Sequence, residues 1–205
     1  MKFFSFKSAP NVRKVMIYLR ERGVETPFET IEVDIMNGEQ NTPEFRAINP
    51  LGKVPALQLD DGTFVTESLP IVEYFEETLP GGRLMLGDTP EERAKIRSIE
   101  RYIEMEITGT MGIMAHNMMP IYTVRFGESP EVVEYARRRQ AMALDFLDNF
   151  IGDRSFVYGD GPTLADISLF VTLESAFLVN AEIEPKYENI IRCYENFSKR
   201  SSVAL

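Results

Sequence analysis

The sequence is poor in the side chains that bind transition metals or act as strong nucleophiles. Among 205 residues it has one cysteine, Cys193, and one histidine, His116. An internal disulfide framework is therefore excluded, and the chain suits a reducing compartment, so the cytoplasm is the expected location. A His/Cys metal cluster is excluded too, no metal is expected, and a Ser-His-Asp triad would have a single possible base. We do not expect His116, between Ala115 and Asn117, to take part in chemistry.

Basic residues are fewer than acidic ones, which limits the partners that the chain can bind through charge. It has 22 Lys and Arg against 32 Asp and Glu, and a formal net charge of -10. Nucleic acid and anionic membranes are therefore not expected as partners. Residues 107–124 carry no charge, but their glycine, histidine, asparagine and proline residues are too polar for a membrane span. Lys7 interrupts the apolar segment MKFFSFKSAP, which lacks the core of a signal peptide.

The first 80 residues mix strand and helix signals at short spacing. The aromatic run KFFSF is typical of a buried strand, and TIEVDI alternates apolar and polar residues as a half-buried strand does. A helix is predicted between them, with Asn11 as N-cap and Gly23 just beyond its end. Strand, helix and strand at this length predict a βαβ unit with a right-handed crossover.

The remainder of this region predicts a hairpin and a closing helix. A short helix is expected over TPEFRAI, and VPALQL and TFVTE form an antiparallel hairpin across Asp60, Asp61 and Gly62. A last helix is predicted to start at Ser68 and to bury one apolar face, which consists of Ile71, Val72, Phe75 and Leu79. The order βαβαββα matches an α/β thioredoxin-like domain that lacks the redox CxxC at its first βα turn.

After about residue 88 the sequence predicts helices only. The segments TPEE, SPEV and TLAD are helix starts with a capping residue, and the last of these precedes the apolar run ISLFVTL. A final helix is expected after Glu184 and Pro185. We therefore predict a domain over residues 1–79, a linker over 80–88 and an all-α C-terminal bundle of about five helices over 89–205.

The stretch NPLGKVPALQLDDGTFVTES carries the first candidate site residues. Pro55 cannot donate to a sheet ladder, so it marks either the entry into the strand, with a cis bond from Val54, or an edge-strand turn. In the first case the backbone of Val54 is free to pair with an extended peptide. Ser68 is a good helix N-cap, and Glu67 beside it is free to bind an amine. The alternative is that both residues serve only the helix start.

These motifs together resemble the cytosolic glutathione S-transferases. NPLGKVPAL, TES before LPIVEYF, and GPTLADISLF in the helical half follow one another as in that family, across nearly the whole chain. The resemblance implies that glutathione is the co-substrate and that Glu67 and Ser68 hold its γ-glutamyl end. It implies further that Val54, beside Pro55, pairs with the cysteinyl part and that Lys53 and Gln40 reach the glycyl carboxylate. It also implies a homodimer.

The segment FSFKSAPNVRKV, where such enzymes hold the sulfur, has neither tyrosine nor cysteine. Alignment with the serine-type members puts Ala9 at the position of their serine, with Ser8 one residue away. Asn11 remains, because bacterial members with a PN turn place this amide near the sulfur. We therefore expect Asn11, rather than Ser8, to stabilise the thiolate through an N–H donor and the helix dipole.

The resemblance also implies an apolar substrate site, lined by Met111, Met114 and Met118, although methionines at helical spacing are also typical of a core. The leading hypothesis is a glutathione transferase that adds the thiolate to an apolar electrophile. The alternatives are a glutathione-dependent isomerase, a reductive dehalogenase or ether-cleaving lyase, a peroxide or disulfide reductase, and a non-catalytic interaction module of the same fold.

Overall fold

The structure is a computed structural model that describes residues 1–204, except for the side chains of Arg125 and Phe126. The chain divides into two compact units, residues 1–85 and residues 86–205. The division falls inside the segment 80–88.

The first unit has the predicted βαβαββα order around a four-stranded sheet. The strands lie in the order β2-β1-β3-β4, with β1 parallel to β2, and with β3 antiparallel to both of its neighbours. The parallel β1–β2 pair across α1 confirms the βαβ unit, and the β3–β4 pair confirms the hairpin. The elements are β1 (Lys2–Ser5), α1 (Pro10–Arg22), β2 (Glu29–Glu32), η1 (Glu39–Asn41), α2 (Pro43–Ile48), β3 (Ala56–Gln58), β4 (Phe64–Thr66) and α3 (Ser68–Thr78).

Several elements are shorter than predicted, β2 and α3 among them. The strand expected over TIEVDI ends at Glu32, because the chain turns at Asp34, whose carboxylate accepts the Asn37 N–H at 3.1 Å. Helix α3 ends at Thr78, so Leu79 follows the helix and is half-buried instead of lying on its buried face.

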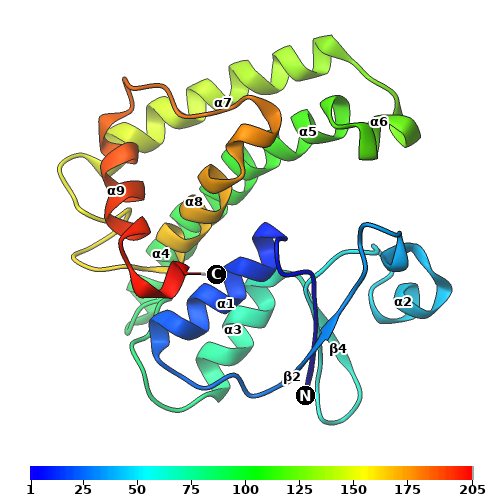
Figure 1. Ribbon diagram of the computed structural model, residues 1–205. Helices are drawn as coiled ribbons and strands as arrows, with labels where there is room; N and C mark the ends of the chain where they lie inside the picture. The colour runs from blue at the N-terminus through cyan, green and yellow to red at the C-terminus, as the bar shows by residue number, and fades with distance from the viewer. Residues whose placement is uncertain (205) are drawn as a thin grey trace. The chain divides into compact units, whose positions relative to one another are not determined.

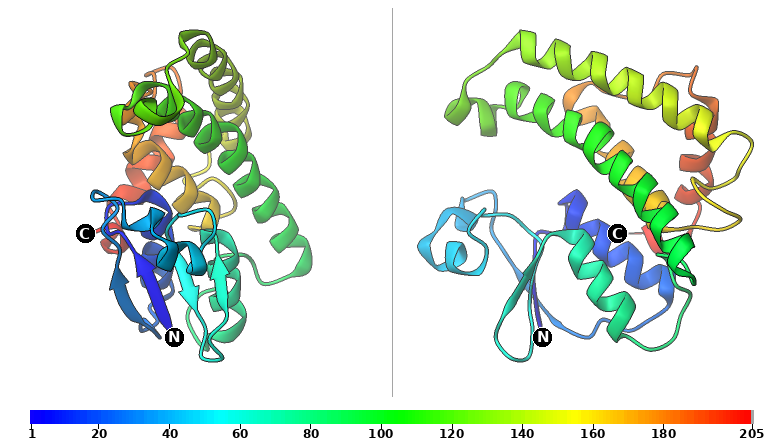
Figure 2. Two further views of the ribbon diagram at one scale, coloured as in Figure 1. Left: turned by 90° about the vertical axis from the view of Figure 1, so that its right-hand side faces the viewer. Right: turned by 180° about the vertical axis from the view of Figure 1, so that it is seen from behind.

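The aromatic side chains of β1 show how the sheet separates the helices. Phe3 is fully buried and stacks on Phe28 with 4.7 Å between ring centres, and Phe28 stacks on Phe75 of α3 at 5.7 Å. Phe4 meets the ring of Phe45 in α2 at 6.2 Å. Successive side chains of a strand face opposite sides. Accordingly, α1 and α3 cover one face of the sheet and α2 lies on the other (Figures 1 and 2).

A buried arginine joins the C-terminal ends of α1 and α3. Arg22, which is 4 % exposed, donates to the carbonyl oxygens of Phe75 at 3.0 Å and Leu79 at 3.1 Å. It also donates to the Tyr18 hydroxyl at 3.0 Å, which in turn donates to Glu76 Oε2 at 2.6 Å. Burial, and then the neighbouring Glu76 carboxylate, raise the pKa of Tyr18 above its ordinary value. This hydrogen-bonded group holds the two helix ends together.

The second unit is helical throughout its described residues. Its elements are α4 (Pro90–Tyr102), the π-helical segment η2 (Ile103–Thr108), α5 (Gly109–Met118), α6 (Pro120–Phe126), α7 (Pro130–Ile151), α8 (Leu164–Glu174), η3 (Ala176–Val179), α9 (Glu188–Ser198) and η4 (Ser201–Val203). Helix α4, η2 and α5 follow one another without a break. The long α7 packs along α5, and α8 packs against α4, η2 and α9 (Figure 1).

The predicted helix starts of this unit are confirmed, except that the last helix begins later than predicted. Thr89 and Glu92 form a full capping box at the start of α4. Helix α9 begins at Glu188, beyond the predicted start at Glu184 and Pro185. The Asp148 carboxylate caps it there by accepting the N–H groups of the next two residues, at 2.9 Å each.

Helix α8 is buried on nearly all sides, and Asp166 fixes its start. Asp166, which is 2 % exposed, accepts hydrogen bonds from the Thr163 N–H at 2.8 Å, the Thr163 hydroxyl at 2.9 Å and the Val157 N–H at 2.7 Å. The predicted Asp166 contact with a backbone N–H of Thr163 is therefore confirmed. Burial raises the pKa of Asp166 to about 6, although the donors around it favour the charged form.

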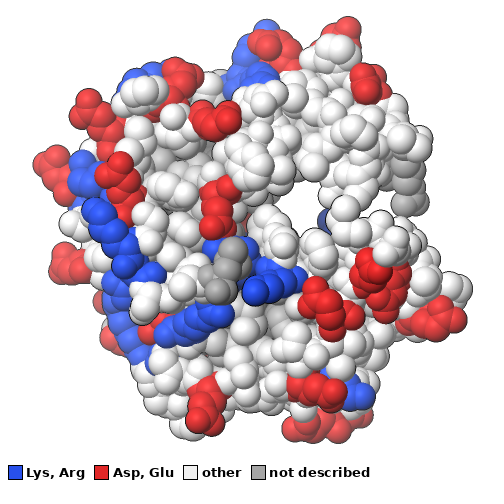
Figure 3. All heavy atoms as spheres, in the orientation of Figure 1, with Lys and Arg blue, Asp and Glu red and all other residues white. Residues whose placement is uncertain are grey.

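Two surface properties bear on function. None of the described helices is long and apolar enough to cross a membrane. On the face drawn in Figure 3, Asp and Glu side chains occur in separate groups and do not gather in one continuous patch.

We expect Asp166→Ala to destabilise the protein, because it leaves two buried backbone N–H groups without an acceptor. The expected loss is about 3 kcal/mol of unfolding free energy. For a chain of this size it corresponds to a fall in melting temperature on the order of 6 to 12 °C. Circular dichroism during heating measures it, and an unchanged melting temperature would contradict the role of Asp166.

Asp166→Asn provides the matched control, because it keeps the shape and removes the titration. The pKa of Asp166 is raised in the folded state, so between its ordinary value of 3.8 and about 6 the folded protein binds more protons than the unfolded chain. The stability that this residue contributes should therefore fall as the pH rises through that window. The Asn variant should lack this part of the pH dependence.

Candidate functional site

Helix α1 opens the candidate site with backbone N–H groups. Its N-cap is Ala9 and its first residue is Pro10, so the prediction of Asn11 as the N-cap is wrong. Proline favours the first position because its ring fixes φ near the helical value and it has no N–H to leave unpaired. The first bond of the helix joins the Arg13 N–H to the Ala9 carbonyl at 3.0 Å. The N–H groups of Asn11 and Val12 are left for a ligand at the positive end of the helix dipole.

Helix α3 begins in a similar way. Its N-cap is Glu67, with a φ of 70°, and Ser68 is its first helical residue, so the prediction of Ser68 as the N-cap is wrong. A positive φ is uncommon for a residue other than glycine. Glu67 is exposed, whereas Ser68 is only 5 % exposed. The first turn of α3 therefore presents an exposed carboxylate beside a buried hydroxyl.

One side-chain contact joins the starts of the two helices. The Ser68 hydroxyl donates to Asn11 Oδ1 at 3.4 Å, although the two residues lie 57 positions apart in the sequence. Asn11 is half-buried, and its Nδ2 group has no hydrogen-bond partner among the described residues. The structure thus places two predicted site residues next to each other, with an amide donor free for a ligand.

Val54 lies beside the sheet but outside its ladder. The bond from Val54 to Pro55 is cis, and β3 starts only at Ala56. Since β3 lies between β1 and β4, the alternative of an edge-strand proline is wrong. The backbone N–H and C=O of Val54 make no hydrogen bond to any described residue.

Asn49, which we did not single out from the sequence, shapes the segment before Val54. It is 2 % exposed, its Nδ2 donates to the Lys53 carbonyl at 2.8 Å, and its Oδ1 accepts the Leu51 N–H at 3.1 Å. The Asn-Pro pair at residues 49 and 50 is a turn signal that would have pointed to it. Asn49 therefore closes the turn that leads to the candidate site.

The same turn packs closely against η1 and α2. Gly52 has a φ of +62°, and a Cβ there would lie 2.6 Å from the Gln40 carbonyl oxygen and 2.8 Å from Arg46 Cζ. The Gln40 side-chain oxygen is buried and has no hydrogen-bond partner among the described atoms. Lys53, the other residue predicted to reach the glycyl carboxylate, is exposed next to Gly52. Backbone contact therefore brings the segments of Gln40 and Lys53 together.

Ser8 lies in the turn between β1 and α1. It is exposed, and its hydroxyl makes no hydrogen bond to the part of the chain that the structure describes. The turn is held by its neighbours, since the Ala9 N–H donates to the Phe6 carbonyl at 2.8 Å and the Lys7 N–H donates to Glu32 at 3.3 Å. Asn11 is held by a partner and Ser8 is not.

Comparison with known proteins decides the family. The profile for the glutathione S-transferase N-terminal domain matches residues 9–78, and that for the C-terminal domain matches residues 123–195. Glutathione S-transferase GstA of Escherichia coli O157:H7 is 30 % identical, over 91 % of this chain and 88 % of that protein. The chain belongs to the glutathione S-transferase family. The fold and the activity class expected from the sequence are thereby confirmed.

Solved structures of the family match the fold over the whole chain. A glutathione S-transferase domain-containing protein of Marinobacter aquaeolei VT8 has a TM-score of 0.90 and 27 % identity, and the match covers 100 % of both chains. Maleylacetoacetate isomerase of Methylobacterium extorquens AM1, solved with malonate and GSH bound, has a TM-score of 0.79 and 25 % identity. That match covers 99 % of this chain and 94 % of the isomerase.

The three methionines of the predicted apolar site in this transferase differ in burial. Met111 is 7 % exposed and Met114 is fully buried, and both belong to a core cluster with Ala136, Ala176 and Val179. Packing in the core therefore accounts for these two side chains.

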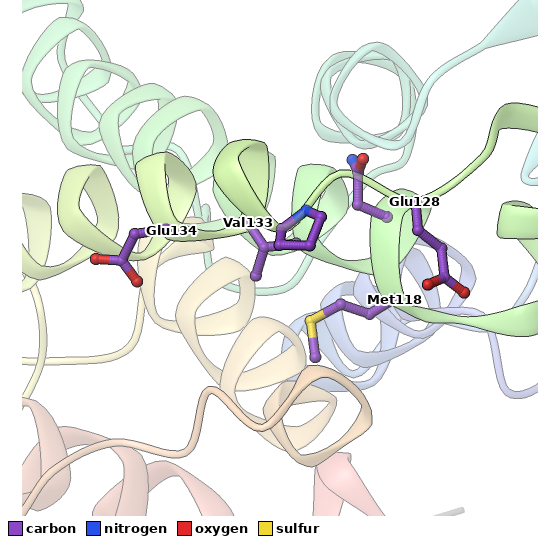
Figure 4. A pocket seen from close by; sticks show the side chains of 6 residues that line it. Met118, Glu128, Val133 and Glu134 are labelled. Atoms are coloured by element: carbon purple, nitrogen blue, oxygen red, sulfur yellow. The ribbon is translucent and has the colours of Figure 1, made fainter.

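Met118 is half-buried and lines a depression of about 350 Å³ in the second unit. Figure 4 shows Met118 and Val133 beside each other, with Glu128 and Glu134 toward opposite ends. Arg137 Nη2 lies 3.9 Å from the Met118 sulfur. Of the three predicted methionines, only Met118 lines this depression.

The single histidine and cysteine have local structural partners. His116 Nδ1 lies 2.7 Å from the Gly112 carbonyl oxygen, and its ring packs on Tyr122 with 4.4 Å between ring centres. Cys193 is 1 % exposed, and burial raises the pKa of its thiol to about 12. Among the described residues, no group of three or more His, Cys, Asp and Glu side chains is placed to hold a metal ion.

We expect Gly52→Ala to weaken glutathione binding by displacing the segment that carries Lys53 and Val54. The new Cβ would overlap the Gln40 carbonyl and Arg46, in addition to the cost of a positive φ. Gly62→Ala is the matched control, because Gly62 has a φ of +86° but nothing within 4 Å of the added Cβ. Calorimetric titration with glutathione should show a clear loss of affinity only for Gly52→Ala, and equal affinities would contradict the proposed role of this turn.

Proposed function

We propose that this transferase binds glutathione in its first unit and adds the glutathione thiolate to an apolar electrophile. The observation that supports the proposal most directly is the meeting of the α1 and α3 starts through Asn11 and Ser68, with the free backbone of Val54 in the same unit. A glutathione-bound structure among its relatives supports glutathione as the co-substrate. The proposed reaction uses no metal, and the buried, free Cys193 is consistent with a cytoplasmic location.

Each part of glutathione has a matching group in the proposed site. The exposed Glu67 carboxylate binds the γ-glutamyl ammonium, and the first N–H groups of α3 and the Ser68 hydroxyl bind the adjacent carboxylate. The Val54 backbone pairs with the cysteinyl residue as a strand would. Lys53 and Gln40 bind the glycyl carboxylate.

Glu67→Gln should therefore weaken glutathione binding, because it removes the charge that pairs with the ammonium. We expect a loss of about tenfold, the lower range for a hydrogen bond to a charged group. Glu77→Gln, an exposed acid near the other end of α3, is the control. Isothermal titration calorimetry measures both, and an unchanged affinity in folded Glu67→Gln protein would reject this assignment.

Asn11 stabilises the sulfur in the proposed mechanism. A free thiol has a pKa of about 8.5, so the site must favour the thiolate at neutral pH. The Asn11 Nδ2 group and the first N–H groups of α1 donate to the thiolate, and its proton leaves to water or buffer because an amide is no base. The thiolate then attacks an electrophilic carbon. As the new S–C bond forms, either a π bond of the electrophile breaks and the resulting anion takes a proton from water, or a leaving group departs with its bonding electrons.

Asn11→Ala should raise the pKa of bound glutathione toward about 8.5 and slow turnover by about tenfold to a hundredfold. Asn11→Asp should raise this pKa further, since a carboxylate beside the thiolate disfavours a second negative charge. Ser8→Ala should change the pKa much less. Titration of the thiolate absorbance decides among the variants, and a larger rise in Ser8→Ala than in Asn11→Ala would return the role to the serine.

A second candidate, a glutathione-dependent isomerase, is favoured by the likeness to the maleylacetoacetate isomerase structure. Addition consumes glutathione, whereas isomerisation of a double bond returns it unchanged. Retention on immobilised glutathione, followed by assays with apolar electrophiles, hydroperoxides and a cis-unsaturated diacid, separates these activities by the thiol that remains. Lyase and reductase activities release other products or oxidised glutathione, and retention without any turnover would indicate an interaction module.

We also propose that the transferase is a homodimer. The large apolar side chains exposed on the second unit include Met105, Tyr135, Met142 and Phe146, with 56, 54, 74 and 48 % exposure. The last three are spaced at i, i+7 and i+11 on α7 and share one helix face. We call Tyr135, Met142 and Phe146 the α7 apolar face. A concentration of exposed apolar side chains is typical of a protein interface.

Met142→Glu should shift the protein toward the monomer, because it places a charge in an apolar contact. Phe177→Glu is the control, since this residue is 62 % exposed and lies in η3, which packs through Arg137 against the opposite side of α7. Sedimentation velocity at micromolar concentration measures the effect. A native protein that sediments as one chain would defeat the homodimer.

A further inference from the structure

We infer that a second copy of this chain packs on the α7 apolar face with its own α7 antiparallel, and that the Arg139–Glu106 ion pair is enclosed at the centre of this contact. The arrangement rests on the proposed homodimer, which leaves the geometry of the two chains open. It uses a face of α7 that the fold of a single chain does not need.

Helix α7 has a buried face toward the core and an apolar face that is largely exposed. Its buried side chains include Ala136, Ala143, Leu144, Leu147 and Ile151. At 3.6 residues per turn, these side chains point about a third of a turn away from the α7 apolar face. The core is therefore complete without that face, and its exposure is typical of a surface that contacts another chain.

A charged pair lies within this apolar surface. Arg139 comes four residues after Tyr135 and three before Met142, so it shares their side of α7. Its Nε and Nη2 donate to the two carboxylate oxygens of Glu106 in η2, at 2.6 and 2.7 Å. The two side chains are 41 and 26 % exposed, so a second chain can cover them. The pair is neutral as a whole and both its oxygens are hydrogen-bonded, which lowers the cost of enclosing it.

The spacing along this side of α7 is the same from either end. Arg139 comes four residues after Tyr135, and Met142 comes four residues before Phe146. An antiparallel copy related by a two-fold axis therefore sets Tyr135 against Phe146 of the partner subunit, and Arg139 against Met142 of the partner subunit. Aromatic side chains meet at both ends of the contact, and the ion pairs lie between them.

Charge decides between the two ways of pairing α7 with its copy. In a parallel pair each side chain meets its own copy, so two Arg139 guanidinium groups would face each other. Like charges that face each other across an interface are unfavourable. In the antiparallel pair each guanidinium lies against a thioether, which is apolar and a weak acceptor. A second copy is the partner that fits this face, because it presents the same spacing in reverse.

Disulfide cross-linking tests the antiparallel arrangement. Tyr135→Cys and Phe146→Cys chains, co-expressed with tags of different length, should give a covalent dimer on mild oxidation, because the antiparallel pair brings the two thiols together. One native aromatic pair remains at the other end of that dimer. Either variant oxidised alone should not cross-link, since each thiol lies about 16 Å from its own copy, beyond the reach of a disulfide. Cys193 is 1 % exposed and does not compete.

The dissociation constant of the dimer tests the place of the ion pair. Arg139→Met and Glu106→Leu should each raise it about thirtyfold or more, because each leaves one charge enclosed without its partner. The double variant should return to within a few fold of the native value, since it encloses no charge. The control is Glu184→Gln/Lys186→Met, which removes an exposed ion pair of 3.6 Å before α9 and should leave the constant unchanged. Sedimentation velocity over a range of concentrations measures all of these.

The outcomes separate this arrangement from the homodimer itself. Cross-links in each variant oxidised alone would show a parallel pair and overturn the antiparallel one. A dimer without any cross-link, or one whose dissociation constant does not change in Arg139→Met, would place the contact elsewhere and leave the homodimer standing. A native protein that sediments as one chain would defeat the homodimer and this arrangement together.

Discussion

The packing of α1 against α3 on one face of the sheet is the constraint on which the candidate site depends. The two helices touch at both ends, through Asn11 and Ser68 at their starts and through Arg22 and the last carbonyls of α3 at their ends. They therefore run parallel, and their positive dipole ends meet at one place. The fully buried Ile71, Val72 and Phe75 hold α3 in this position. The concentration of N–H groups at the site follows from this packing and does not depend on a residue that takes up or releases a proton.

Such a site has enough electrostatic capacity to hold a thiolate. Lowering a thiol pKa from about 8.5 to about 7 requires about 2 kcal/mol. A helix dipole supplies about 0.3 to 1 kcal/mol, and a hydrogen bond to a charged group contributes about 1.5 to 3 kcal/mol. One well-placed amide at the start of α1 therefore suffices. The orientation of that amide matters more than its identity as an acid or base, because it removes no proton.

The second unit serves as a scaffold whose order comes from its buried helix α8. Asp166 satisfies three donors at the start of this helix, and residues from Leu164 to Thr172 are buried on its sides. Met111 and Met114 belong to the neighbouring core cluster. A side chain that fills a core cannot at the same time be displaced freely by varied substrates. Met118, half-buried at the edge of that cluster, is thus better placed than the other two to contact a ligand.

The sequence by itself determined the element order, the hairpin and the capping boxes at Thr89 and Asp166, because these depend on residues close together in the chain. It also placed Asn11, Ser68 and Val54 in one predicted site, and of these the structure brings Asn11 and Ser68 into contact. It did not predict which residue caps α1 and α3, since Pro10 moves the start of α1 two positions toward the N-terminus and the positive φ of Glu67 moves that of α3 by one. Nor did it predict the roles of Asn49 and Gly52, whose partners lie in a turn and in neighbouring elements. Only the tertiary structure decided that the Ser68 hydroxyl meets Asn11 and not its own helix, because that contact exists only once two segments 57 residues apart are packed side by side.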